Sequence, residues 1–270
     1  MAINAMNPQA KFRRSPPTWT AILCALLLLP VAALGGGPTC PADRSDQRVV
    51  SAKVFDGDTL ALTDGRRVRL LGINTPEIGH DGEPTEPFAK EAEELLRRLA
   101  GAGARLRLRL DKERFDRYGR LLAHVFRDGG DNLQARLLGA GYATTLVVPP
   151  NEWSMGCYAA VEALARKRRL GIWGLAAYQP VPAATLADSA RGFRLVTGRV
   201  QRVGESRGNL WLNLSRHMAV RIPKDDLAYF AELDPRQLAG RHVEVRGWIH
   251  KRRGELRITV RHPAALTLLD

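Results

Sequence analysis

Residues 54–59 read VFDGDT, and residues 69–77 read RLLGINTPE. The first segment ends a strand-like run and places Asp56 and Asp58 on a tight turn, and the second segment carries Arg69 and Glu77. Carboxylates bind hard metal ions, and the guanidinium group of arginine binds phosphate. Together the two segments predict metal-assisted cleavage of a phosphodiester.

Strands and turns alternate around these segments. Residues 48–73 read strand, turn, strand, turn, strand, and Asp64-Gly65 is a hairpin signal within them. Residues 104–110 alternate leucine with arginine, which predicts a half-buried strand with Arg105, Arg107 and Arg109 on its outer face. A further strand is expected at residues 120–126. Helices are expected at residues 87–99, 132–138 and 151–170, the last with Asn151 as its N-cap.

The second part of the chain repeats the same order of elements. Residues 175–192 lose periodicity and contain prolines, so they predict a linker. Strand-like runs, one helical segment and two more strands follow, at residues 196–203, 210–214, 218–222, 225–238, 243–249 and 256–260. This order suits the OB-fold, a five-stranded barrel that often binds oligonucleotides. The predicted fold class is mainly β with helices (α+β): an OB-type barrel with three helices over residues 48–174, then a second, smaller OB-like barrel over residues 193–270.

The charge points to an anionic partner. The 270 residues suffice for two domains, and their net charge is +13 with a pI near 10.4. Such an excess favours binding to nucleic acid or to an anionic membrane surface. Residues 193–270 hold 15 basic and 8 acidic residues, a net charge of +7, whereas residues 40–192 carry only +3. We expect chemistry in the first domain and added phosphate affinity in the second.

The N-terminal 39 residues resemble a secretory signal. Basic residues precede an apolar run from Trp19 to Leu34, which Pro30 interrupts and glycines follow. The run is shorter than the roughly 20 apolar residues of a membrane span. The sequence therefore predicts a cleaved signal and a periplasmic or secreted protein, and the alternative is an uncleaved anchor in the inner membrane.

The cysteines permit one disulfide. Cys24 would leave with the signal, so the mature chain keeps Cys40 and Cys157, an even count that suits a single bridge in an exported protein. Two unrelated buried thiols are the alternative.

Four blocks now identify a resemblance. DGDT at residues 56–59, RLL leading to TPE at 69–77, DRYGRL at 116–121 and GIW at 171–173 occur in the order of the staphylococcal (micrococcal) nuclease family. The resemblance covers residues 48–174, under half of the chain. It implies an OB barrel with three helices and calcium-dependent hydrolysis of DNA and RNA.

The resemblance also implies roles for individual residues. By this resemblance, Asp58 corresponds to a calcium ligand of the family. Thr75 corresponds to a residue whose backbone carbonyl binds calcium. Glu77 corresponds to the general base that takes a proton from a metal-activated water, and Arg69 and Arg120 correspond to the arginines on the scissile phosphate. Hard oxygen ligands, a base within reach of water and two permanent positive charges suit that reaction.

Two departures from the family pattern matter. Asn74 stands where the family has a second aspartate ligand, so the site keeps an oxygen donor but loses one negative charge. This predicts weaker calcium binding or tolerance of other divalent ions. The loop at residues 144–150 has Leu146, Val147 and Val148 in place of tyrosines that pack a nucleotide.

Three predictions concern residues around this set. Asp56 is expected to support the ion or simply to hold the turn. Tyr118, next to Arg117, is the nearest aromatic side chain left to contact nucleic acid. The alternative to an endonuclease is a non-catalytic nucleic-acid-binding protein with a decayed site. The endonuclease is favoured because the sequence keeps all four central residues, Asp58, Arg69, Glu77 and Arg120.

The C-terminal part carries its own expected contacts to nucleic acid. Trp211 lies between two leucines on a predicted strand and faces away from them, so it is expected to stack with bases, and packing is the alternative. The turn Lys251-Arg252-Arg253 is expected to contact phosphate. The expected partners are DNA, RNA or both, with Ca²⁺ and no small-molecule cofactor. We expect a monomer that meets the membrane only if the N-terminal segment is retained.

Overall fold

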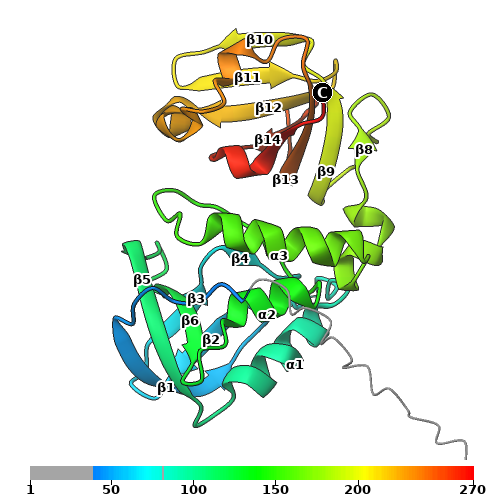
Figure 1. Ribbon diagram of the computed structural model, residues 1–270. Coiled ribbons are helices and arrows are strands. Elements are labelled where there is room, and N and C mark those ends of the chain that lie inside the picture. The colour runs from blue at the N-terminus through cyan, green and yellow to red at the C-terminus, as the bar shows by residue number, and fades with distance from the viewer. Residues whose placement is uncertain (1–38, 81) are drawn as a thin grey trace, which may run out of the picture. The chain divides into compact units, whose positions relative to one another are not determined.

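The computed structural model describes residues 39–80 and 82–270 (Figure 1). The predicted signal segment lies outside these residues, apart from Thr39. Within the described part of the chain, no helix is both long enough and apolar enough to cross a membrane.

The first half forms a closed five-stranded barrel (Figure 1). The strands follow one another around it in the order β1 (Gln47–Val54), β2 (Thr59–Leu62), β3 (Arg67–Leu70), β6 (Leu121–Arg127) and β5 (Arg105–Phe115). All neighbours are antiparallel except β3 and β6, which are parallel. The prediction of an OB-type barrel is confirmed.

The barrel core follows from the alternation of its strands. Leu106 and Leu108 of β5, Leu60 of β2 and Leu70 of β3 are fully buried, because every second residue of a strand faces the same side. The three expected helices are present as α1 (Ala89–Ala100), α2 (Leu133–Gly139) and α3 (Met155–Lys167). Between the barrel and the second sheet lie two short 3₁₀ helices, η1 (Gly171–Gly174) and η2 (Ala176–Tyr178).

The predicted N-cap of the third helix is wrong. Helix α3 begins at Met155, and Asn151 lies before it, where its side chain pairs with the backbone of Glu113 in β5. The Glu113 N–H donates to Asn151 Oδ1 at 2.8 Å, and Asn151 Nδ2 donates to the Glu113 carbonyl at 3.1 Å. The amide that suits a cap is used instead to tie the loop to the barrel.

The expected outer position of Arg109 is also wrong. Its side chain is buried, and its guanidinium lies 4.5 Å from the ring centre of Trp153. Arg109 Nε donates to Asp43 at 3.1 Å, and Asp111 lies 3.5 Å from Arg109 Nη1. The N-terminal segment and the loop before α3 cover this part of β5, whereas Arg105 remains exposed.

The second half forms an eight-stranded sheet, and its strands follow one another in the same order as those of the first barrel (Figure 1). Its main path is β10 (Arg202–Glu205), β11 (Asn209–Asn213), β12 (Met218–Pro223), β14 (Glu255–Thr259), β13 (His242–Arg252), β9 (Gly192–Arg199) and β8 (Val181–Pro182), and β15 (Leu266–Leu268) also pairs with β13. As in the first barrel, the third and last strands of the repeat, β12 and β14, are parallel. Only two residues separate β9 from β10, so one strand run borders both β13 and β11, as in an OB-fold.

Two predictions for this half need correction. The segment 175–192 is more than a linker, because β8 within it pairs with β9 in parallel. The expected helix at residues 225–238 is two short 3₁₀ helices, η3 (Lys224–Phe230) and η4 (Pro235–Gln237). A third 3₁₀ helix of this half, η5 (Pro263–Ala265), precedes β15. Pro235 lacks the N–H that a continuous α-helix would require there.

Candidate active site

The Asp-Gly-Asp turn joins β1 to β2 and fixes its own shape. The Asp58 N–H donates to Asp56 Oδ1 at 2.9 Å, so Asp56 holds the turn. A Cβ atom on Gly57 would lie 2.6 Å from Ala92 Cβ in α1 and 2.7 Å from Thr75 Oγ1. Only glycine allows the turn to approach the helix and the threonine this closely.

Asp58 lies at the centre of a buried hydrogen-bond network. The residue is 5% exposed, and its Oδ2 accepts from both the backbone N–H and the hydroxyl of Thr75, each at 3.1 Å. Arg69 Nη2 lies 2.9 Å from the same oxygen. The other carboxylate oxygen accepts from the Thr59 hydroxyl at 3.2 Å.

Arg69 and Asn74 complete this network. Arg69 Nη2 also donates to Asn74 Oδ1 at 3.1 Å, and Asn74 Nδ2 donates to the Thr75 carbonyl at 2.9 Å. Asn74 belongs to β4 (Ile73–Asn74), which pairs with β7 (Thr144–Thr145) and is thereby held beside the barrel. Asp58, Asn74 and Thr75, the three predicted metal-binding residues, are therefore joined to one another through hydrogen bonds.

Glu77 follows this network on a closed loop. Its N–H donates to Glu86 Oε2 at 2.9 Å, and its carbonyl accepts from the Glu86 N–H at 2.9 Å. Partial burial raises the pKa of Glu77, and the negative charges of Asp58 and Asp56 raise it further. Burial and the charge of Asp58 likewise raise the pKa of Asp56.

Arg120 enters the site from the strand next to Arg69, because it directly precedes β6, the neighbour of β3. Its Nε donates to Asp116 Oδ2 at 2.7 Å, while Asp116 Oδ1 accepts from the N–H groups of Tyr118 and Arg120 and so closes the turn. Arg69 and Arg120 line the same cavity of about 220 Å³. Arg69 lies on β3, and Arg120 directly precedes β6. The two strands are parallel neighbours.

The loop at residues 144–150 borders the same cavity and brings no aromatic side chain to it. Leu146 and Val148 line it, as expected from the absence of tyrosines there. Tyr118 is 68% exposed, and the guanidinium groups of Arg117 and Arg120 lie 4.8 and 5.6 Å from its ring centre. These three side chains form an exposed basic and aromatic edge beside the cavity.

The donor chemistry fits a hard divalent cation. It offers a carboxylate, an amide oxygen and a backbone carbonyl, all oxygen ligands of the kind that calcium takes. Among the described residues, no three His, Cys, Asp or Glu side chains gather closely enough to hold a metal by themselves. A bound cation would thus depend on the mixed set Asp58, Asn74 and Thr75. Its charge would counteract the burial and the repulsion between carboxylates that raise the pKa values of Asp56 and Glu77.

Comparisons with known proteins agree with this geometry. The family described as "Staphylococcal nuclease homologue" matches residues 67–174. A thermonuclease of Staphylococcus intermedius is 33% identical over 144 residues, which are 52% of this chain and 84% of that protein. The chain belongs to the staphylococcal nuclease family. It is therefore a nuclease, and nucleic acid is its substrate.

Other relatives of this nuclease are bacterial endonucleases. Endonuclease YncB of Bacillus subtilis (strain 168) is 32% identical over 146 residues, 51% of this chain and 68% of that protein. Endonuclease YhcR of the same organism is 25% identical over 214 residues, which are 75% of this chain but only 17% of that protein. The second match extends beyond the barrel into the C-terminal sheet.

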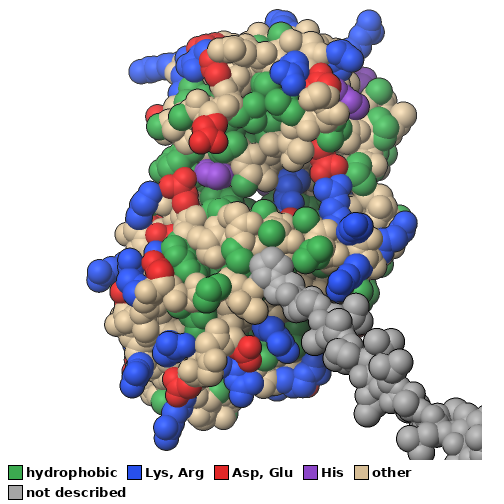
Figure 2. All heavy atoms as spheres, viewed as in Figure 1, with side chains coloured by type: hydrophobic (Ala, Val, Ile, Leu, Met, Phe, Trp, Pro, Cys, Tyr) green, Lys and Arg blue, Asp and Glu red, His purple; other side chains and the backbone are tan. Residues whose placement is uncertain are grey.

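The predicted C-terminal contacts do not form one group. Trp211 and Arg252 line a separate cavity on the C-terminal sheet of the nuclease. Lys251 Nζ donates to the Asp188 carbonyl at 3.1 Å, and Arg253 occupies the turn between β13 and β14. On the face that Figure 2 shows, Lys and Arg side chains are scattered rather than collected into a single patch.

Arg246 is a residue near the site that the sequence did not single out. It comes from β13, and its guanidinium forms an ion pair with the buried Glu162 of α3 at 2.7 Å. Arg246 Nη2 also donates to the Thr145 carbonyl at 2.9 Å, and the Thr145 N–H donates to Glu162 at 2.7 Å. Since Thr145 belongs to β7, the partner strand of Asn74, this residue of the C-terminal sheet supports the strand pair behind the predicted ligands.

The disulfide that the cysteine count permits is present. Cys40 and Cys157 are bonded, with their Cα atoms 5.7 Å apart, and they are separated by 117 positions in the sequence. The bond joins the segment before β1 to α3. Cys40 is buried in the barrel core.

Proposed function

We propose that the protein is an exported, calcium-dependent endonuclease that hydrolyses phosphodiester bonds of DNA and RNA. One observation carries the proposal: Arg69, paired with Asp58, shares a single cavity with Arg120. Two guanidinium groups on one cavity, beside a set of oxygen ligands, are what a phosphate undergoing attack by water requires.

Asp58, Asn74 and Thr75 would hold the calcium ion through their oxygen atoms. When bound there, calcium supplies positive charge to the phosphate and lowers the pKa of bound water. We assign metal binding to these three residues because their oxygens belong to one hydrogen-bonded network.

Glu77 acts as the general base in this proposal. Its raised pKa makes its carboxylate a better proton acceptor than an ordinary glutamate, and its loop is closed by the hydrogen bonds with Glu86. General base catalysis of this kind contributes about 10²–10⁴ in rate.

Arg69 and Arg120 bind and orient the phosphate. Each is already fixed by hydrogen bonds, Arg69 by Asp58 and Asn74 and Arg120 by Asp116. A guanidinium group is a permanent cation in proteins, so the two side chains can stabilise the negative charge that builds on the phosphate oxygens during attack.

Export is part of the proposal because the N-terminal segment resembles a cleaved signal and the disulfide suits an oxidising compartment. We place the mature protein in the periplasm or outside the cell, as a monomer. Retention of the segment would instead anchor it in the inner membrane.

The test is a cleavage assay of the mature protein on plasmid DNA and on RNA, with calcium and with chelator. We expect calcium-dependent cleavage that falls by about 10²–10⁴ in Glu77→Gln. The matched control is Glu83→Gln, which removes the same charge from the same loop. Binding of nucleic acid without cleavage by the wild-type protein would favour the alternative, a non-catalytic nucleic-acid-binding protein.

A further inference from the structure

A second cavity, of about 290 Å³, lies on the C-terminal sheet, away from the barrel that carries Arg69 and Arg120. Its lining comes from four strands, β11, β12, β13 and β14. The side chains that give it its character are Trp211, Arg221, His250, Arg252 and Arg257. None of the described residues that line it is acidic.

Strand register places these side chains on one outer face. Trp211 is opposite Arg221, and Arg221 is opposite Thr259. Arg257, two residues before Thr259, is opposite His250. The residues between them along the strands, such as Leu212 and Val220, are buried on the other face, so the alternation of each strand directs the whole basic group outward.

The indole of Trp211 supports Arg257. The Arg257 guanidinium lies 4.7 Å from the centre of the Trp211 ring, and its Nε donates to Glu255 at 2.7 Å. Trp211 Nε1 donates to Ser206 Oγ at 3.1 Å, which fixes the ring. The expectation that Trp211 itself stacks with bases therefore changes: Arg257 covers one of its faces and presents a planar cation in its place.

Arg221 is held in the same manner. Its Nε donates to Asn209 Oδ1 at 2.7 Å. In the part of the chain that the structure describes, the terminal Nη atoms of Arg221 and Arg257 have no hydrogen-bond partner. Each guanidinium is thus oriented through Nε while its terminal donors stay available to an anion.

We propose that this cavity binds single-stranded nucleic acid, with the arginine Nη atoms on successive phosphates and an unpaired base on the guanidinium plane of Arg257. Guanidinium planes stack with bases and their terminal donors bind phosphate, and only a single strand can turn its bases toward a protein surface. The inference rests on the proposed function for the identity of the polymer, and it adds a second binding site on the C-terminal sheet.

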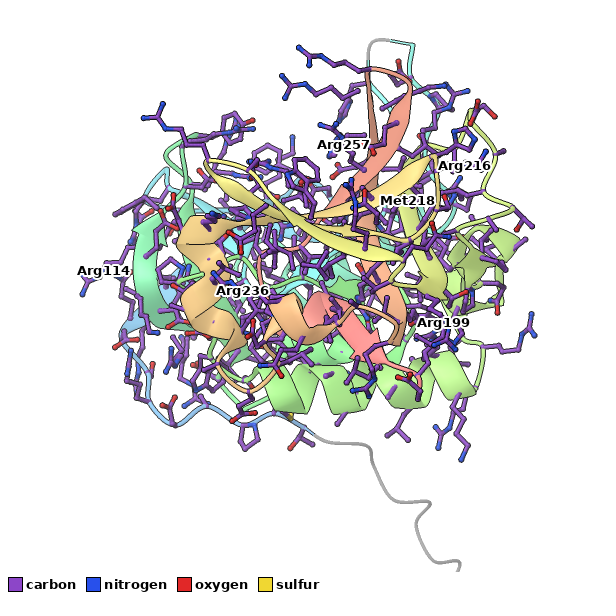
Figure 3. All side chains as sticks on the ribbon, turned by 90° about the horizontal axis from the view of Figure 1, so that it is seen from above. Arg114, Arg199, Arg216, Met218, Arg236 and Arg257 are labelled. Atoms are coloured by element: carbon purple, nitrogen blue, oxygen red, sulfur yellow. A yellow bond between two sulfur atoms is a disulfide. The ribbon has the colours of Figure 1, made fainter. Side chains whose placement is uncertain are left out.

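The experiment measures binding in chelator, where cleavage does not interfere. The probe is a labelled oligothymidylate of about 12 nucleotides, within the range that one OB-type surface covers. Fluorescence anisotropy compares the full mature protein with Arg221→Ala/Arg257→Ala and with the control Arg207→Ala/Arg216→Ala. The control removes the same charge from exposed turns that join strands of the same sheet, outside the cavity. Figure 3 labels Arg257 of the cavity pair and Arg216 of the control pair.

We expect the cavity variant to lose about tenfold or more in affinity, a loss comparable to that of one base stack. Its salt slope should fall by about 1.4, since each single-strand phosphate contact contributes about 0.7. The control should keep the wild-type affinity to within a factor of about two. Arg257→Lys, which keeps the charge but loses the plane, should retain the slope and still bind more weakly.

Equal losses in the cavity and control variants would overturn the proposal, because binding would then follow net charge alone. An equal loss for a duplex of the same length would overturn the preference for single strands. Circular dichroism and thermal unfolding establish that the variants are folded. Since the assay needs no cleavage, a protein that binds but does not cut would contradict the proposed function and leave this inference standing.

Discussion

The Arg69 guanidinium lies 2.9 Å from the Asp58 carboxylate, and the two side chains are only 14% and 8% exposed. The pair connects the residue expected to bind phosphate with the residue expected to bind metal. A substitution of either residue should therefore alter the position and the electrostatic environment of the other.

Stability should depend on this pair being complete. We expect Arg69→Met to destabilise the protein by about 3 kcal/mol, because Asp58 would keep its charge in a buried site without its partner. Asp58→Asn in the same chain should recover part of the loss. Urea unfolding of the two single variants and the double variant gives the coupling free energy, expected at about 1–3 kcal/mol. Strictly additive effects would mean that the ion pair contributes nothing.

Asn74 should limit the affinity for calcium. Asn74→Asp restores a negative charge beside Asp58 and Thr75, so we expect calcium to bind about tenfold more tightly, a difference of about 1.4 kcal/mol. Isothermal titration calorimetry measures the change directly. Asn74→Ala, which removes the oxygen donor, should bind more weakly than the wild-type protein, and equal affinities for all three proteins would remove Asn74 from the ligand set.

Gly57 should be intolerant of any side chain. The added methyl group of Gly57→Ala would displace Thr75 or α1, and a shift of that size near the reacting groups lowers kcat/KM by about 10². The control is Gly129→Ala, where an added Cβ meets no atom within 4 Å. The comparison is between the cleavage rates of the two variants, measured at a temperature where both are folded. A fully active Gly57→Ala would show that the close approach is not needed.

The disulfide should stabilise the whole barrel. Because the bridge closes a loop of more than 100 residues, we expect Cys40→Ser/Cys157→Ser to lower the free energy of unfolding by about 2–5 kcal/mol. Treating the wild-type protein with reductant should give the same loss, whereas the double variant should not respond to it. A reductant-insensitive wild-type protein would contradict the prediction.

Arg246 should couple the C-terminal sheet to the nuclease barrel. Arg246→Met would leave Glu162 buried without its cation, so we expect a loss of about 3 kcal/mol. Glu162→Gln in the same chain should relieve much of that loss, since the uncompensated charge is removed. Unfolding curves of both variants decide between this and a surface contact of no consequence, for which Arg246→Met would unfold like the wild-type protein.

Local pattern was enough to predict the barrel. Alternating leucines marked the strands, Asp64-Gly65 marked a hairpin, and the four sequence blocks identified the family. The same blocks contained Asp58, Arg69 and Arg120, which the structure brings to one network and one cavity.

Pairings between distant residues could not be predicted in this way. The local sequence predicts Asn151 as a helix cap, whereas its actual partner, Glu113, lies 38 residues away on another element. Strand alternation predicts Arg109 as exposed, whereas the segments that bury it, around Asp43 and Trp153, come from elsewhere in the chain. A single sequence records which residues alternate, but not which distant segment will cover them.

The Cys40–Cys157 bond encloses every residue assigned to catalysis in one covalent ring. A protease that cut the chain once inside this ring, for example in the exposed loop at residues 82–86, would not release a fragment. The two pieces would stay joined through sulfur, and the barrel strands on both sides of the cut would remain paired. In the exported setting proposed above, such a nick would leave the nuclease in one piece, whereas it would divide an unbridged chain in two.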